Sequence, residues 1–499
     1  MGRILLDKRG RLRVEAMAGA MVGILVSILY LRTLAPGVLP YAQMTQDSPA
    51  LQSTVPNLGI SHPTGYPTYM MLAHLFTYLP VGEVAYRVNL ASAAFATVAV
   101  VLVYLVGLKL CGRALAAAAG AVAFGVSQTF WSQAIIAEVY TLNAAFLTMV
   151  FLILLIWRER REDKYILLAA FAAGLALTNH LTSGLLLPAG LLFVWLVDSC
   201  KLAQAGLWLR GALLFILGLL PYAYLPVRAS ARLPENTADT STLGGFLTVV
   251  SGGPFKGWMF SFGPLELVGR LRMYMGYLNE QFPLPLLLVG VVGAVYMLAR
   301  DAAGAVLLGV IFLGSLVYAL EYDVSDVRVF FLPTYLVLGL WISVGMGAVS
   351  ELIEDRLAWY SRAERTGTAS MLPVVGLAVA LLGTVGAYSE VDRRQDDRGR
   401  EMIRSVVGKA EPGATIVHRR SPLLYMQEVK NRREDLALWD FRETHTEEEL
   451  ARASEALLEG DLYFLSPEPE MIERFEDGGY LLKPLGESEM LYRAIPPER

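Results

Sequence analysis

The stretch that decides the fold runs from Ala114 to Trp157 and reads ALAAAAGAVAFGVSQTFWSQAIIAEVYTLNAAFLTMVFLILLIW. Glu138 is its only formally charged residue, and Arg113 and Arg158 bound it on either side. A helix needs about 20 apolar residues to cross the hydrocarbon core of a bilayer. The stretch therefore predicts two membrane spans, over 114–131 and 138–157, joined by a short turn.

The composition of the whole chain also indicates a membrane protein. Of its 499 residues, 55% are hydrophobic and 18% are charged, whereas about 25% of the residues of a soluble protein are charged. This excludes a water-soluble globule of this size, and the net charge of −4 gives no indication of nucleic-acid binding. We expect about eleven spans, with the short pair 165–179 and 181–197 broken or tilted, at 14–33, 86–108, 114–131, 138–157, 165–179, 181–197, 207–226, 284–300, 303–320, 328–349 and 371–388.

The distribution of charge divides the chain into two parts. The segment from Ser389 to the C-terminus holds 17 basic and 25 acidic side chains, whereas the first 388 residues are slightly basic. The expected elements of the acidic segment alternate: strands at 414–418, 436–440, 462–465, 480–485 and 491–495, and helices at 400–407, 422–430, 447–458 and 468–475. The predicted fold class is therefore mainly α, with a polytopic membrane domain over 1–388 and a small soluble α/β domain over 389–499.

Basic residues predict the orientation in the membrane. Lys and Arg favour cytoplasmic loops, and they occur in the segments 109–113, 158–164, 198–210 and 351–368. The N-terminus is then cytoplasmic, and an odd number of spans places the soluble domain on the extracytoplasmic face. Two long loops, 34–85 and 227–283, lie on that outer side. Their apolar segments 66–79 and 254–262 are too short to span and suit either helices at the membrane interface or packed connecting helices.

The first outer loop contains an isolated carboxylate. Asp47 is the only formally charged residue between Arg32 and Glu83. Two roles are open for it. Followed by Ser48 and Pro49, it makes a suitable N-cap for a helix. A carboxylate held where water is scarce can instead act as a general base.

Other polar residues stand at the outer ends of spans. Glu138 is costly at such a position unless it has a partner, so we expect a functional role, although it could face water. His62 and Tyr66 belong to the rigid turn HPTGYP (62–67), which suits either substrate contact or a structural turn. His180 follows two polar residues between two spans and can bind a phosphate or a carboxylate, or simply complete the turn.

Two charged residues complete the set. Arg228 ends the sequence YAYLPVR (222–228) on the outer side, where its guanidinium suits a lipid phosphate or a lipid headgroup. Asp326 lies in the turn EYDVSDVR (321–328), whose charges can also pair locally. We expect one polar pocket at the outer edge of the bilayer, lined by Asp47, His62, Glu138, His180, Arg228 and Asp326.

The order of these motifs resembles that of a known family. They are the blocks Asp47-Ser48, HPTGYP (62–67), AEVYTL (137–142), Asn179-His180, YAYLPVRA (222–229) and DVRVFFLP (326–333). They are similar to the blocks of the family once labelled domain of unknown function 2723, which looks like a branch of the GT-C glycosyltransferases related to the protein O-mannosyltransferases. The resemblance covers residues 14–350, and the segment YMQEV (425–429) extends it past the membrane part.

The resemblance implies a GT-C fold and a polyprenyl-phosphate sugar, often mannose, as donor. The first-loop acid, here Asp47, would act as the base or align the acceptor hydroxyl, and attack on the anomeric carbon would expel the lipid phosphate with inversion. On chemical grounds Arg228 would steady that phosphate, and the residues contacting substrate would be His62, Tyr66, Tyr140, His180 and Asp326.

One departure from the family pattern concerns the acidic residues. Many members read Asp-Ser-Gly-Glu in the first loop, whereas this chain has Ala50 in place of the glutamate. Three consequences are open: Glu138 supplies the second carboxylate, the acceptor differs, or activity is lost.

The main hypothesis is an integral-membrane glycosyltransferase that moves a sugar, mannose in first place, from polyprenyl phosphate to a hydroxyl. The acceptor would be a protein Ser or Thr, or else a glycan or lipid. We expect no cofactor, and Cys111 and Cys200 show neither disulfide nor metal spacing. The alternative is a polytopic transporter or lipid flippase, which would carry polar groups on both sides. A non-catalytic binding protein would tolerate changes at Asp47 and Glu138.

Overall fold

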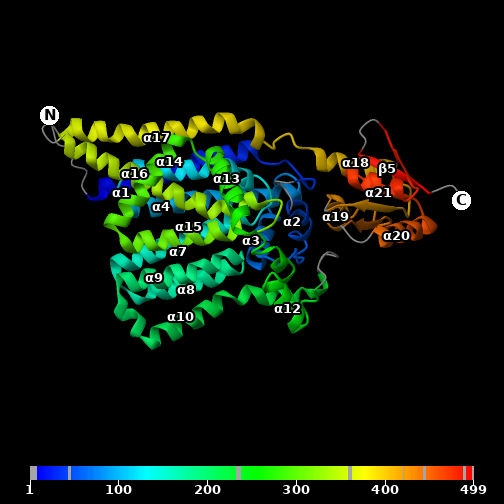
Figure 1. The fold of residues 1–499 in the computed structure, drawn as a ribbon, viewed down its shortest axis with the longest axis horizontal. Coiled ribbons are helices and arrows are strands. Elements are labelled where there is room, and N and C mark those ends of the chain that lie inside the picture. Colours follow the sequence, from blue (N-terminus) through cyan, green and yellow to red (C-terminus); the bar gives the residue numbers. More distant parts are fainter. Residues whose placement is uncertain are drawn as a thin grey trace.

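The computed structural model describes residues 8–42, 47–231, 238–357, 362–419, 421–441, 446–486 and 490–496. Figure 1 shows two parts, a bundle of long helices and a smaller α/β domain that lies against one end of the bundle. The first helix, α1 (Lys8–Thr33), starts at the opposite end.

The bundle has helices at each of the predicted apolar segments and further helices in the two long loops between them. After α1 they are α2 (Ser48–Thr54), α3 (Pro67–Phe76), α4 (Val84–Cys111), α5 (Ala114–Gly125), α6 (Gln128–Ala134), α7 (Tyr140–Arg160), α8 (Asp163–Leu177), η1 (Leu181–Leu185), α9 (Leu186–Val197), η2 (Ser199–Ala203), α10 (Ala205–Gly218), η3 (Leu220–Ala223), α11 (Tyr224–Val227), η4 (Ala229–Ala231), α12 (Leu243–Val250), η5 (Gly253–Trp258), α13 (Pro264–Gln281), α14 (Leu284–Arg300), α15 (Ala302–Leu320), η6 (Val327–Phe331), α16 (Leu332–Arg356) and α17 (Arg362–Val391).

The number of spans is smaller than expected. Among the described residues, seven helices are long and apolar enough to cross a membrane, or up to nine if each of two bent pairs is one span. The pairs are α5 with α6, bent by 70°, and α13 with α14, bent by 110°. This count of helices of full bilayer length lies below the expected eleven spans, whereas the predicted fold class, a helical membrane bundle with a small C-terminal sheet, is confirmed. One reason is that α8 has only 15 residues, and at 1.5 Å per residue it reaches about 22 Å of a core that is about 30 Å thick.

Helix α16 lies at the centre of the bundle. In the most apolar part of the span Val327–Arg356, 89% of the residues are buried, compared with 28% in that of α1. Helix α5 packs directly on α16 because both present glycine at the contact: a Cβ on Gly120 would lie 2.2 Å from the Gly339 carbonyl oxygen. Close packing of this kind is common between membrane helices, where small residues let the backbones approach.

The α/β domain has the alternation that the sequence predicts. Its five strands lie in the order β2-β1-β3-β5-β4, with β1 parallel to both neighbours and β5 antiparallel to both of its own. Every predicted element occurs within two residues of its expected position, as α18 (Arg398–Lys409), β1 (Thr415–His418), α19 (Leu423–Glu428), β2 (Ala437–Asp440), α20 (Thr446–Glu459), β3 (Leu462–Leu465), α21 (Pro469–Asp477), β4 (Leu481–Pro484) and β5 (Leu491–Ile495).

The short helix α2 lies where the two parts meet. All seven of its residues are buried. On the bundle side, Ser48 Oγ donates to the Ala137 carbonyl oxygen at 3.0 Å, and on the other side Ala50 packs against Leu424 of α19. Because Asp47 directly precedes α2, this junction fixes the position of the first-loop carboxylate.

The two aromatic segments of the outer loops are partly exposed. Helix α3 buries one face, including Tyr69 and Met70, and Leu75 is 61% exposed. In the second segment Trp258 and Phe260 are 47% and 74% exposed. Both segments therefore combine a packed face with apolar side chains that are free to enter a membrane interface.

Candidate active site

Asp47 and His62 form the centre of the candidate site. Asp47 occupies the N-cap position of α2, but its side chain makes no capping hydrogen bond. One carboxylate oxygen, Oδ2, lies 3.3 Å from His62 Nε2 instead. Of the two roles left open by the sequence, the N-cap is therefore not seen, and the role of general base stays a prediction.

The HPTGYP turn holds His62 through both ring nitrogens. Ser61 Oγ lies 3.1 Å from Nδ1, and the Tyr66 hydroxyl lies 3.0 Å from Nε2. Tyr66 adopts the left-handed conformation (φ 44°) as α3 begins, which turns its ring back onto His62. Burial raises the pKa of Tyr66, and the nearby charges of Asp47 and Glu138 raise it further, so the phenol keeps its proton and can donate it.

Glu138 is the buried carboxylate of the site. It is 3% exposed, and its backbone is fixed by two 3.0 Å hydrogen bonds with Ser92 Oγ. Burial raises the pKa of Glu138, and the charges of Asp47 and Asp326 raise it further, against the backbone hydrogen bonds from Val139 and Asp47. Among the described residues, Glu138 Oε2 has no hydrogen-bond partner. A buried carboxylate oxygen in this state is a ready site for a polar ligand.

His180 supplies a neutral ring close to this cluster. Burial lowers the pKa of His180 to about 4, so its imidazole is uncharged at neutral pH. The Thr182 N–H donates to Nδ1 at 3.3 Å, which places the ring proton on Nε2. The ring stacks on Tyr66 with centroids 6.4 Å apart and lies 5.5 Å from Tyr140.

A small pocket opens beside these rings. It is lined by Tyr140, Asn143, Ala144, Leu147, His180, Thr182, Val329, Phe330, Leu332, Pro333 and Leu336. Residues adjacent in sequence to the site carry further buried oxygens without a hydrogen-bond partner in the described part of the chain, namely Thr64 Oγ1, Thr141 Oγ1 and Asn179 Oδ1. Unused hydrogen-bonding capacity of this kind suits a ligand rich in hydroxyl groups.

Asp326 joins the cluster, whereas Arg228 does not. The charge of Asp326 acts on Glu138, although the two lie far apart in the sequence. The guanidinium of Arg228 donates to the carbonyl oxygens of Leu58 and Asn57 at 2.8 and 2.7 Å. Arg228 thus ties α11 to the end of the α2 segment, and phosphate binding would require it to release these carbonyls.

Sequence reasoning missed several residues that shape the site. Phe330 lies 6.0 Å from the His180 ring and 5.9 Å from the Tyr140 ring, and its place directly after the charged turn at 321–328 was the available signal. Ser92 holds the backbone of Glu138 from inside α4, where a serine in an apolar span gives no signal. Within the described residues, no group of three or more His, Cys, Asp or Glu side chains is arranged to hold a metal ion.

Comparison with known sequences gives matches over the part that carries most of the site. Residues 47–202 match the family described as the N-terminal domain of protein O-mannosyl-transferase TMEM260. Protein O-mannosyl-transferase TMEM260 of Mus musculus is 34% identical over 248 residues, which make up 48% of this chain and 34% of the mouse protein. The protein of the same name from Dictyostelium discoideum is 24% identical over 208 residues, 38% of this chain and 25% of that protein. The chain thus spans about a third of the length of the mouse relative and a quarter of that of the Dictyostelium relative.

Solved structures share the fold over nearly the whole chain. ArnT from Cupriavidus metallidurans in the apo state superposes with a TM-score of 0.59 at 13% identity, covering 96% of this chain and 98% of ArnT. ArnT bound to undecaprenyl phosphate gives 0.56 at 14% identity, covering 96% and 97%. The apo oligosaccharyltransferase of Archaeoglobus fulgidus gives 0.56 at 11% identity, covering 93% of this chain and 70% of that enzyme. The GT-C fold and the relationship to O-mannosyltransferases that the motifs predict are confirmed.

Proposed function

From this relationship to the protein O-mannosyltransferases, we propose that the chain is an integral-membrane glycosyltransferase that moves a sugar from a polyprenyl-phosphate donor to an acceptor hydroxyl. Mannose is the proposed sugar and a protein Ser or Thr the proposed acceptor, because the curated relatives are named for that reaction. The donor class is supported by the neighbour of the same fold that is bound to undecaprenyl phosphate.

One observation carries this proposal. Glu138 is a buried carboxylate whose Oε2 has no hydrogen-bond partner in the part of the chain that the structure describes, and it lies beside a second carboxylate, Asp47, that contacts a histidine. Such a cluster at the end of a membrane bundle provides a base, a second acid and hydrogen-bond donors in a site with little water. These are the groups that glycosyl transfer without a covalent intermediate needs.

The proposed reaction is a single displacement. The acceptor oxygen attacks the anomeric carbon as its proton passes to the Asp47 carboxylate. The bond from that carbon to the phosphate oxygen breaks, and its electron pair leaves with the lipid phosphate. Attack opposite to the leaving group inverts the configuration. His62, at 3.3 Å, holds the base in place and stabilises its charge.

Glu138 takes the place of the glutamate that many family members have at the position of Ala50. Because its pKa is raised, it keeps a proton at a higher pH than an ordinary carboxyl and can donate a hydrogen bond to a sugar hydroxyl. His180 Nε2 and the Tyr66 hydroxyl are the proposed donors to the leaving phosphate, in place of Arg228. Hydrogen-bond donors aimed at a developing negative charge can supply several kcal/mol of transition-state stabilisation, roughly 3 per donor.

The test uses purified protein in detergent with radiolabelled polyprenyl-phosphate mannose and a Ser/Thr-rich peptide. We expect label in the peptide with the wild type and none above background with Asp47→Asn. Binding of the donor without transfer to any hydroxyl acceptor would contradict the proposal. Addition of EDTA checks the expectation that no divalent metal is required, because activity should then be unchanged.

A transporter or lipid flippase stays the second candidate function. It requires polar groups along a path across the bilayer, whereas the charges of Asp47 and Asp326 both act on Glu138 at one end of the bundle. Donor lipid that crosses the bilayer of a proteoliposome without losing its sugar would favour this alternative.

A further inference from the structure

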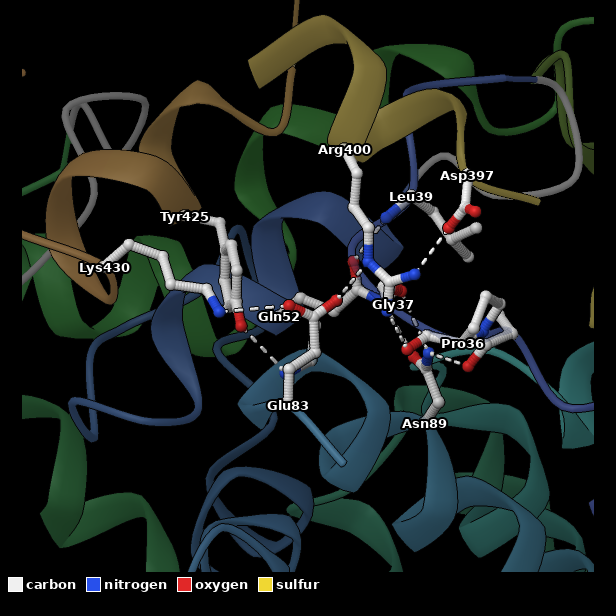
Figure 2. A network of polar contacts seen from close by, with 12 residues as sticks. Pro36, Gly37, Leu39, Gln52, Glu83, Asn89, Asp397, Arg400, Tyr425 and Lys430 are labelled. Carbon is white, nitrogen blue, oxygen red and sulfur yellow. Dashed lines mark hydrogen bonds and ion pairs between the residues drawn. The ribbon is translucent and has the colours of Figure 1, made fainter. Parts of the chain in front are cut away.

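The α/β domain is joined to the bundle through Glu83. The Glu83 side chain is only 18% exposed, and its two carboxylate oxygens bind different cations, Arg400 Nε and Lys430 Nζ, each at 3.0 Å. Figure 2 shows both cations converging on Glu83 from two elements of the α/β domain. Arg400 belongs to α18, and Lys430 follows α19.

The start of α4 depends on the same junction. Glu83 is the N-cap residue of α4 but makes no capping hydrogen bond with its side chain. The Tyr425 hydroxyl accepts the hydrogen bond of the Ala85 N–H at 3.1 Å instead. The first N–H groups of a helix have no partner within the helix, so here the α/β domain provides the cap.

Arg400 also binds the segment that leads into α2. One of its guanidinium nitrogens, Nη2, donates to the Pro36 carbonyl oxygen at 2.7 Å. Neighbouring glycines permit the close approach: a Cβ on Gly399 would lie 2.2 Å from the Val38 carbonyl oxygen, and one on Gly37 would lie 2.8 Å from Arg400 Nε. The backbone of α18 therefore rests directly on the backbone of residues 36–39.

Gln52 connects this segment to α2. Its side chain is fully buried, accepts from the Leu39 N–H at 2.9 Å, and donates to Asn89 Oδ1 at 2.7 Å and to the Gly37 carbonyl oxygen at 3.3 Å. Figure 2 shows Gln52 and Asn89 below Arg400 in the same network. A shift of residues 36–39 would therefore move α2.

The α/β domain contacts the rest of the Asp47 segment as well. Before Asp47, Arg419 lies over the Tyr41 ring at 5.2 Å. After it, Leu424 packs against Ala50, and Asn57 Nδ2 donates to the Glu428 carbonyl oxygen at 2.8 Å. The segment that carries Asp47 is thus held by the α/β domain on both sides of that residue.

From these contacts we infer that Arg400 is a positioning residue for Asp47, acting through residues 36–39 and Gln52. The inference rests on the proposed function, because it assigns the α/β domain the task of aligning the base with the acceptor. Small displacements matter in such a site, since a shift of about 1 Å can lower a rate by about 100-fold.

The experiment compares Arg400→Gln with Arg400→Lys and with Arg404→Gln, a control at an exposed position of the same helix. We expect Arg400→Gln to lower kcat by about ten-fold with the donor KM within about two-fold of the wild type. Arg400→Lys keeps the positive charge opposite Glu83 but cannot also donate to the Pro36 carbonyl oxygen, so we expect its kcat to lie between those of Arg400→Gln and the wild type. Arg404→Gln should match the wild type.

Hydrogen–deuterium exchange provides a readout that does not depend on activity. We expect faster exchange in Arg400→Gln across residues 35–57 and unchanged exchange in α16. Faster exchange throughout the molecule would show general destabilisation and overturn the inference, as would wild-type exchange together with wild-type kcat. If the wild type transfers no sugar, the proposed function fails, whereas the exchange data still decide whether Arg400 holds the segment.

Discussion

Asp47 shows how little separates two roles at the level of a single residue. The sequence Asp-Ser-Pro at this position is compatible with two roles of the aspartate, as the N-cap of a helix or as a general base. Only the direction of the carboxylate, toward His62 and away from the N–H groups of α2, distinguishes them. Sequence alone offers candidates for the chemistry but does not show where a side chain points. The same limit explains Arg228, whose guanidinium binds carbonyl oxygens of the protein.

The first prediction concerns the base. Asp47→Asn keeps the shape of the side chain but removes the proton acceptor, so kcat should fall by about 100- to 10,000-fold. The measurement is the transfer of label from polyprenyl-phosphate mannose, together with donor binding, which should persist. Transfer at the wild-type rate would remove Asp47 from the mechanism.

The second prediction concerns the pH dependence of stability at Glu138. Its raised pKa means that the folded state binds the proton more tightly than the unfolded state does. This stabilisation is complete below the ordinary carboxyl pKa of about 4.3 and is lost as the pH rises through the raised value. As the pH rises from 4.5 to 8, the melting temperature of the wild type should therefore fall relative to that of Glu138→Gln.

A matched control variant makes this result specific. The exposed Glu401 of α18 gives a matched variant, Glu401→Gln, whose melting curve should run parallel to that of the wild type over the same pH range. Parallel curves for Glu138→Gln as well would show that burial does not perturb the carboxyl.

At the level of elements, local patterns were sufficient in the α/β domain and insufficient in the bundle. Strands of the α/β domain alternate with amphipathic helices, and the spacing of apolar residues in the sequence distinguishes the two. In the bundle, a straight span, a bent span and a short helix all have the same apolar sequence pattern, so the pattern does not distinguish them. The breaks within α5–α6 and α13–α14 therefore depend on packing that no local signal reports.

The third prediction belongs to strand β1. Its last residue, His418, is 2% exposed, and burial lowers the pKa of His418 to about 4. The unfolded state then binds protons more readily, so stability is complete above about pH 6.5 and is lost as the pH falls toward 4. A pKa lowered this far corresponds to about 3 kcal/mol of stability at neutral pH. In His418→Gln, thermal unfolding at pH 7 and pH 4.5 should differ less than in the wild type.

For the whole molecule, the sequence predicted two parts and their order but not the junction between them. The GT-C fold followed from the motif order, and the α/β domain from the change in charge. The junction depends on contacts such as Arg400 with Glu83, which are 317 residues apart. A single sequence contains no signal for such a pair.

The fourth prediction tests the proposed orientation. Cys200 is exposed in the short helix η2, on the side proposed to be cytoplasmic. A membrane-impermeant maleimide should label it only after permeabilisation of cells. In a Cys200→Ser background, Glu411→Cys on the exposed surface of the α/β domain should be labelled in intact cells. The reverse pattern would place the site in the cytoplasm.

The contact between Glu83 and the α/β domain has a consequence for biosynthesis. The segment around Asp47 is made early, whereas the residues that hold it, Arg400, Tyr425 and Lys430, are made only after all the helices of the bundle. A nascent chain can insert most of its helices while the loop around Asp47 still lacks these partners. The site can therefore be completed only after Lys430 has been made, and a chain cut short before Arg400 lacks the contacts that hold the segment around Asp47.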